Sequence, residues 1–258
     1  MTGIHPVLET RDLTIRFGGH VAVDGVSCSF QPGTLTAIVG PNGAGKTTYF
    51  NLVSGQLPAT SGQVLLYGED VTRAPAPLRT RKGMGRAFQL TSLFPNLTVL
   101  ENVRLAVQAR AGLGLNLVSL WSTHIELIER AEHCLERVSL AERRATLAAE
   151  LSHGDQRKLE VGILLALEPE IFMFDEPTAG MSVDEVPVVL DLIHEIKAQK
   201  DKTILLVEHK MDVVRSLADR IIVLHQGRLV ADGAPAEVIA SPIVQEAYLG
   251  VAKEAPGG

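Results

Sequence analysis

The sequence predicts an α/β fold: a core with a mostly parallel sheet, an antiparallel β subdomain and a helical insertion. Three observations lead to this fold class. Residues 7–40 are β-rich, helical periodicity without a clear strand dominates from about 90 to 150, and strands alternate with helices after residue 151. Such alternation implies parallel strands joined by right-handed crossovers. We expect one domain over 1–258, with the core and β subdomain at about 1–89 and 151–250, helices at about 90–150, and a tail at 251–258.

Each element follows from the local pattern. Short apolar runs bounded by turn residues predict strands at 8–17, 26–30, 34–40, 64–68, 84–88, 171–174, 203–208 and 220–224. Apolar residues at helical spacing predict helices at 45–54, 98–110, 122–140, 154–168, 184–198 and 210–217. Residues 225–233 are typical of a hairpin, and 73–80, with two prolines, of a loop or short helix.

Composition narrows the functional classes. The net charge of −6 and the pI near 5.8 lack the basic footprint of a nucleic-acid binder, so no nucleic-acid partner is expected. Cys28 and Cys134 have no metal-ligand spacing, which favours reduced packing residues. We expect no secretory signal, and no apolar run approaches the ~18 residues that span a bilayer. Work at a membrane would require a partner that holds the protein there.

The stretch GPNGAGKTT matches the phosphate-binding pattern G-x-x-x-x-G-K-[ST] between a predicted strand and a predicted helix. Glycines let backbone N–H groups surround phosphate oxygens, and the helix N-terminus adds its dipole. Lys46 is expected to neutralise the β- and γ-phosphates, and Thr47 to ligate Mg²⁺. The alternative is a glycine-rich turn with a surface lysine. The pattern predicts a P-loop NTPase core whose nucleotide ligands are Gly40, Pro41, Asn42, Gly43, Ala44, Gly45, Lys46, Thr47 and Thr48.

Four further residues at strand ends suit the chemistry of ATP hydrolysis. Asp175 ends the apolar run IFMF and is expected to hold Mg²⁺ through water. Glu176 follows it, points differently, and is expected to act as the general base on the attacking water. Gln89 and His209 follow other strands, where they would sense the γ-phosphate, Gln89 also as a ligand of Mg²⁺ or its water.

The order of these motifs resembles the ATP-binding subunit of an ABC transporter over almost the entire chain. GPNGAGKT, Gln89, LSHGD, IFMFDE and His209 correspond to its Walker A motif, Q-loop, signature, Walker B motif and switch histidine. The resemblance implies ATP and Mg²⁺ as cofactors, and ATP hydrolysis coupled to transport. It also implies that Phe17, in TIRFGG, stacks on adenine in place of the commoner Tyr.

The signature has a particular role in that family. Two subunits meet head to tail, and the signature helix of one caps the γ-phosphate bound by the other. The resemblance implies that Ser152 donates its hydroxyl to that phosphate and that Gly154 allows a close approach. Three departures stand out: His153 for Gly, Asp155 for Gln, and Ser182 for the D-loop Asp. We expect His153 and Asp155 to point away from phosphate, and Ser182 weakens the argument for communication between subunits there.

The stretches DEPTAGM, VEHKMD and VQEAYLG resemble ATPases that power uptake of branched-chain or other hydrophobic amino acids, or urea; lipopolysaccharide export remains an alternative. The implied partners are permease subunits docked at 90–103, a second copy or another ABC ATPase, and a solute-binding protein. The implied location is the cytoplasmic face of the inner membrane. Two other classes of protein are alternatives. A non-transport ABC ATPase would usually interrupt the core with a coiled coil or a zinc module, and this chain has neither heptads nor Cys clusters. A P-loop kinase would explain the phosphate loop but would give LSHGD and His209 no role.

Overall fold

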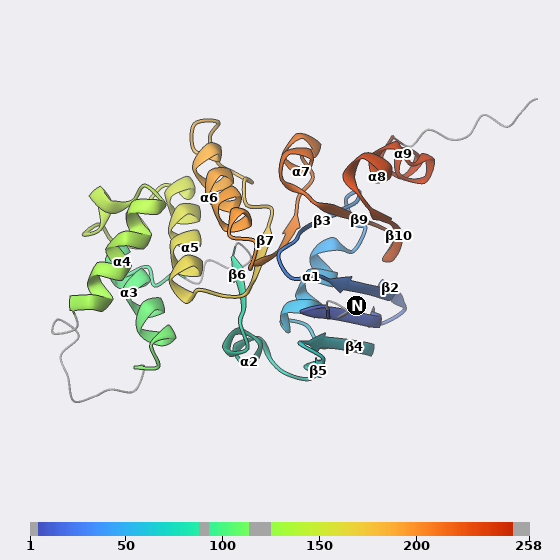
Figure 1. Ribbon diagram of the computed structural model, residues 1–258, viewed down its shortest axis with the longest axis horizontal. Coiled ribbons are helices and arrows are strands. Elements are labelled where there is room, and N and C mark those ends of the chain that lie inside the picture. The colour runs from blue at the N-terminus through green and yellow to red at the C-terminus, as the bar shows by residue number, and fades with distance from the viewer. Residues whose placement is uncertain (1–4, 88–92, 114–124, 250–258) are drawn as a thin grey trace, which may run out of the picture. The chain divides into compact units, whose positions relative to one another are not determined.

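A computed structural model describes residues 5–87, 93–113 and 125–249. Their backbone falls into two compact units, which we call the first unit (1–84 and 200–258) and the second unit (85–199). Both combine strands and helices, which confirms the α/β class (Figure 1). No helix in the described ranges is both long enough and apolar enough to cross a membrane.

The first unit contains the amino- and carboxy-terminal elements. They are β1 (Leu8–Phe17), β2 (His20–Phe30), β3 (Leu35–Val39), α1 (Lys46–Ser54), β4 (Ser61–Leu66), β5 (Glu69–Asp70), α2 (Ala76–Arg81), β8 (Thr203–Val207), α7 (Met211–Leu217), β9 (Arg220–His225), β10 (Arg228–Gly233), α8 (Pro235–Ala240) and α9 (Pro242–Leu249).

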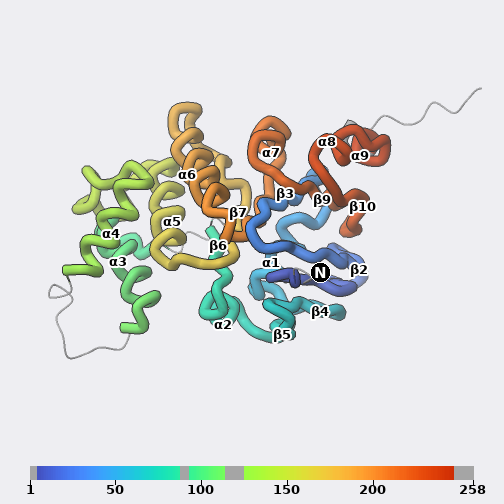
Figure 2. Tube along the Cα trace, viewed as in Figure 1, coloured from blue at the N-terminus to red at the C-terminus, as the bar shows by residue number. Residues whose placement is uncertain are grey.

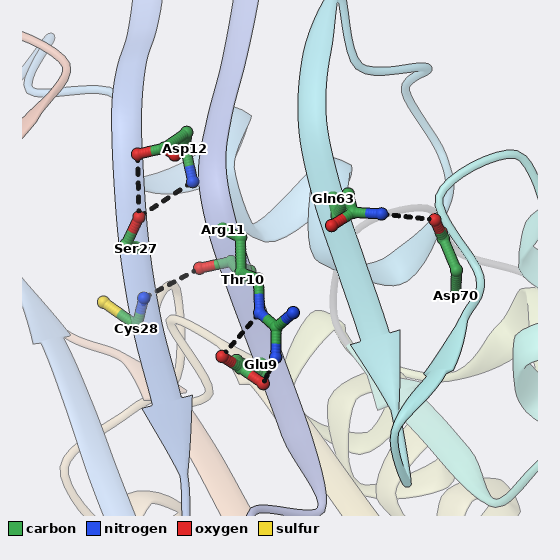
Figure 3. Close-up of polar contacts among 8 residues, drawn as sticks. All are labelled: Glu9, Thr10, Arg11, Asp12, Ser27, Cys28, Gln63 and Asp70. Carbon is green, nitrogen blue, oxygen red and sulfur yellow. Dashed lines mark hydrogen bonds and ion pairs between the residues drawn. The ribbon is translucent and has the colours of Figure 1, made fainter.

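One sheet of the first unit is antiparallel, in the order β2-β1-β4-β5, as expected for the β subdomain. The Thr10 hydroxyl accepts the Cys28 N–H at 3.1 Å, which ties β1 to β2 (Figure 3). The same hydroxyl lies 3.0 Å from the Tyr49 hydroxyl of α1. Asp12, with φ of 47°, interrupts the β1–β2 register and is held by Ser27. Burial raises the pKa of Cys28 to about 11, which fits a reduced packing residue.

The other strands of this unit form the parallel core. β3 is buried along its whole length, with β8 and β9 parallel on its two sides, and β10 closes a hairpin with β9. A strand covered on both faces reads as a continuous apolar run, which is why LTAIV lacks alternation. Because Ile38 pairs with Val207, the carboxyl ends of β3 and β8 lie at the same sheet edge.

Two short helices at the end of the first unit were not expected from the sequence. Val238 of α8 and Val244 of α9 pack with Val214 of α7 against β3 and β9, and Figures 1 and 2 show α7, α8 and α9 near these strands. Both α8 and α9 begin with a proline and have too few turns to show a periodic pattern.

The second unit contains a helical part and the element that carries the acidic pair. Its elements are β6 (Met84–Ala87), which starts at the unit boundary, α3 (Val99–Arg110), α4 (Ile125–Arg137), the 3₁₀ turns Ala141–Arg143 and Ala148–Glu150, α5 (His153–Leu167), β7 (Ile171–Asp175) and α6 (Val186–Ala198). Helix α3 packs on α4 and α5, as the tube in Figure 2 traces. A capping box between Thr98 and Glu101 starts α3.

Candidate nucleotide-binding site

The loop between β3 and α1 has the backbone of a phosphate cradle. Gly40 has φ of 153° and Gly45 of 95°, and a Cβ at these positions would lie 2.1 Å from the Leu224 carbonyl oxygen and 2.5 Å from that of Ala22. Both positions therefore require glycine. Gly45 is the N-cap of α1, whose first turn carries no acidic residue and no side-chain cap. The positive end of the helix dipole consequently faces the loop.

Lys46 supplies the charge of this cradle. Its side chain is buried, with 8% exposed, and its Nζ donates to the carbonyl oxygens of Gly40 at 2.7 Å and Pro41 at 3.0 Å. The ammonium group is thus held inside the curve of the loop rather than in solvent. A fixed cation, a helix N-terminus and two obligatory glycines together fit a bound polyphosphate.

The rest of the loop is anchored at one end and open at the other. The Ala44 carbonyl accepts the Gly227 N–H at 3.0 Å, and the Gly227 carbonyl accepts the Asp24 N–H at 2.8 Å. Gly227 lies in the β9–β10 turn, for which the sequence predicts a hairpin and no contact with this loop. Asn42, Gly43 and Thr47 are exposed, and Pro41 and Thr48 are half-buried.

Phe17 lies at the end of the β1–β2 hairpin, where it pairs with His20, and half of its side chain is exposed. Two residues further along β2, the Ala22 carbonyl packs against Gly45. The hairpin end therefore adjoins the phosphate loop. An exposed ring beside a phosphate cradle is available for stacking on a base.

His209 lies two residues beyond the end of β8, on the sheet edge from which the phosphate loop leaves β3. Its side chain is 51% exposed, and its Nδ1 lies 3.6 Å from Oε2 of the fully buried Glu208. The same oxygen accepts the backbone N–H groups of His209 at 2.7 Å and Lys210 at 3.1 Å. Glu208, to which the sequence pattern assigns no role, thus shapes the turn that presents the imidazole.

In the second unit, β7 ends in a buried acidic residue next to a strained one. Asp175 is the last residue of β7, with 7% of its side chain exposed, and Arg86 of β6 donates to it at 2.9 Å. Burial lowers the pKa of Arg86, against the attraction of Asp175, which raises it. Glu176 follows with φ of 50°, a conformation that a non-glycine residue rarely adopts.

The start of α5 presents the signature residues. Ser152, an exposed residue, is the N-cap, and its hydroxyl accepts the Asp155 N–H at 3.1 Å. Accepting uses a lone pair, so the hydroxyl hydrogen can still be donated to a ligand. The Asp155 carboxylate is turned into the unit, 3.0 Å from Lys158 Nζ and 3.5 Å from Arg143, while His153 is exposed.

The phosphate loop, the acidic pair after β7 and the signature residues can now be compared with known protein families. The sequence pattern of ABC transporters matches residues 23–179, from β2 to beyond β7. The chain belongs to the ABC transporter family. It is an ATP-binding subunit with ATPase activity, which works in a transport system with permease subunits. A second pattern, that of branched-chain amino acid ATP-binding cassette transporters, matches residues 228–254.

Relatives and solved structures agree with this placement. The high-affinity branched-chain amino acid transport ATP-binding protein LivG of Escherichia coli (strain K12) is 39% identical over 96% of this chain and 99% of its own. BraF of Pseudomonas aeruginosa, with the same description, is 38% identical with the same coverage. A nucleotide-free ATP-binding cassette from an ABC transporter superposes with a TM-score of 0.80 at 30% identity, covering 94% of this chain and 98% of its own. The ADP conformation of MJ1267, another such cassette, also gives 0.80 at 30% identity, covering 95% and 99%.

Within this ABC subunit the structure groups the expected residues in two sets. The first unit brings the phosphate loop, Phe17 and His209 to one region, and the second unit carries Asp175 with Glu176 at the end of β7 and Ser152 with Gly154 at the start of α5. Gln89, the first residues of the expected docking stretch 90–103 and the tail 251–258 lie outside the described residues.

The Arg86–Asp175 pair yields a prediction about stability. Replacing Arg86→Met is expected to lower the free energy of unfolding by about 3–5 kcal/mol, because a buried carboxylate loses its cationic partner. Urea unfolding followed by circular dichroism measures the change. Arg130→Met is the matched control: it breaks an ion pair with Glu168 whose side chains are about half exposed, and should change stability by less than about 1 kcal/mol. Equal effects of the two substitutions would contradict the prediction.

Proposed function

We propose that the chain is the ATP-hydrolysing subunit of an importer for branched-chain or other hydrophobic amino acids. The carboxy-terminal match to branched-chain amino acid cassette transporters carries this proposal, because it is specific to one branch of the family. Relatives bearing that description, 38–39% identical over nearly the whole chain, support it. The wider system would then include a solute-binding protein, and the subunit would work at the cytoplasmic face of the inner membrane.

The nucleotide is assigned to the cradle of the first unit. The loop Gly40–Thr48 surrounds the phosphates with the backbone N–H groups of its residues other than Pro41. Lys46 transfers its hydrogen bonds from carbonyl oxygens to the β- and γ-phosphates. Phe17 stacks on the adenine ring. The His209 imidazole contacts the γ-phosphate from the end of β8 and holds it in line.

The metal-binding and catalytic roles belong to side chains that fit them chemically. Bound Mg²⁺ would supply charge neutralisation at the β- and γ-phosphate oxygens. The Thr47 hydroxyl, the Asp175 carboxylate and the Gln89 amide are oxygen donors of the kind this cation prefers. The Glu176 carboxylate accepts the proton of the attacking water.

The signature residues are assigned to a second subunit's nucleotide. Ser152 and Gly154 lie at the N-terminus of α5, where an anion is favoured, and Ser152 is an exposed residue. In a head-to-tail dimer, with a second copy or with another ABC ATPase, they cap the γ-phosphate held by the partner. ATP then closes the dimer and hydrolysis opens it, which moves the permease.

Reconstitution tests the proposed cargo. The chain is assembled with its permease and solute-binding protein in lipid nanodiscs, and ATP hydrolysis is measured with the binding protein loaded with leucine, loaded with urea, or empty. We expect leucine to raise the ATPase rate severalfold over the empty protein, since cargo-loaded binding protein favours the closing conformation. If only urea raised the ATPase rate, the cargo would be urea instead of an amino acid. If lipopolysaccharide raised it in a complex without a binding protein, the system would be an exporter of lipopolysaccharide.

A further inference from the structure

The carboxylate of Glu185 lies against Gly154, the signature glycine. A Cβ built on Gly154 would fall 2.1 Å from Oε1, 2.2 Å from Oε2 and 2.3 Å from Cδ of Glu185. The space that this glycine leaves open is therefore filled by an anionic group of the same chain. Both residues belong to the second unit.

A local network holds Glu185 in this position. Its Oε2 accepts the Ser182 N–H at 3.0 Å and the Ser182 hydroxyl at 2.8 Å, and its Oε1 lies 3.8 Å from Lys158 Nζ. The hydrogen bonds from Ser182 lower the pKa of Glu185, so it is ionised at neutral pH. Ser182, which replaces the usual Asp of this segment, thus holds a carboxylate where an Asp would repel one.

The position is one that favours anions. Glu185 approaches the first turn of α5 beside the N-cap Ser152, where the helix dipole stabilises negative charge. The neighbouring acidic group, Asp155, lies 3.5 Å from Arg143 and shares Lys158 with Glu185, since the Lys158 ammonium donates to Asp155 at 3.0 Å. The same end of α5 is where the proposed function places the γ-phosphate of the partner subunit. Two anions cannot occupy it together without strong repulsion.

We propose that the Glu185 carboxylate competes with the partner-bound γ-phosphate for the surface of Gly154, and that ATP-driven closure expels it. The inference rests on the proposed role of the signature across the dimer. Because Ser182 binds the same carboxylate oxygen through two groups, departure of Glu185 releases the turn 182–185 as well. Arrival of ATP at one subunit is in this way transmitted to the segment that follows the Walker B motif of the other.

Radiolabelled ATP binding to the assembled transporter tests the competition, with Glu176→Gln present throughout to slow hydrolysis. Adding Glu185→Gln, which removes the charge but keeps an oxygen for Ser182, should tighten apparent ATP binding by about fivefold or more, within the usual range of coupling between sites. Glu185→Ala should act in the same direction. The isolated subunit, dilute and monomeric, should bind ATP unchanged, because Glu185 lies outside its own cradle.

Two further variants separate the possible failures. Asp184→Asn, which removes an exposed charge one residue earlier, should leave assembled binding within about twofold. Ser152→Arg should weaken assembled binding and spare the monomer. Suppose that Ser152→Arg weakens ATP binding by the assembled transporter, but that both Glu185 variants bind ATP no more tightly than the Glu176→Gln protein from which they are made. The proposed competition is then wrong, and the action of the signature on the partner's nucleotide is retained. If Ser152→Arg has no effect, the proposed signature role fails, and with it this inference.

Discussion

Glu176→Gln is expected to lower the turnover of ATP hydrolysis by about 10²–10⁴ while leaving ATP affinity intact. This is the range for loss of a general base, since the amide cannot accept the proton of the attacking water. The residue lies directly after the buried strand β7, and its left-handed backbone is the kind of strain that persists where a side chain must be aimed. The variant should accumulate the ATP-bound, closed dimer.

Single-turnover phosphate release, together with equilibrium ATP binding, measures this effect. Glu170→Gln makes the same chemical change at the other end of β7, just before Ile171, and should keep the wild-type rate. A Glu176→Gln enzyme that hydrolyses ATP at nearly the wild-type rate would remove Glu176 from the role of base. A loss of ATP affinity would instead point to damage of the cradle.

The larger elements could be predicted because they carry their own local signal. The strand at Leu35–Val39 is a buried apolar run, and α1 follows a glycine-rich turn, so both were expected within about a residue of their observed bounds. The helices α8 and α9 and the two-residue strand β5 were not. Each is too short to show periodicity. The two helices are held by contacts distant in sequence, Val238 and Val244 on the core of the first unit.

The site shows the same division between local and distant contacts. Residues that belong to a motif, such as Lys46 and Asp175, can be identified from the sequence because the phosphate and the strand end dictate their spacing. The residues that contact them in the folded chain cannot be identified in this way. Arg86 is 89 positions from Asp175, and a lone arginine in a strand reads as a solvated charge. Glu185 likewise reads as a surface residue of a helix start, and only the folded chain places it on Gly154.

Ser152→Arg is expected to abolish hydrolysis by a dimer of identical subunits, while the isolated subunit binds ATP in its own cradle as the wild type does. Ser152 is exposed at the start of α5, so an arginine there extends into the space proposed for the partner's γ-phosphate. The substitution also removes the N-cap, which costs about 0.5–2 kcal/mol of stability. Ser152→Ala, which loses the cap without the bulk, is the control for that loss and should retain more activity.

Mixing Ser152→Arg with Lys46→Ala decides whether the signature acts in trans. Lys46→Ala removes the ammonium group that the loop holds beside Gly40 and Pro41, so that subunit is expected to bind nucleotide weakly and hydrolyse none. In a mixed dimer, the intact cradle of the Ser152→Arg subunit faces the intact signature of the Lys46→Ala subunit, which restores about one working site. The second site carries both lesions and stays silent. A signature acting within its own chain gives no rescue, because each subunit keeps its own defect.

The ATPase rate is therefore measured across a mixing series in assembled transporters, with mixed dimers verified by differential tags. Zero activity at every ratio, despite verified mixed dimers, would refute the trans-acting role of LSHGDQ.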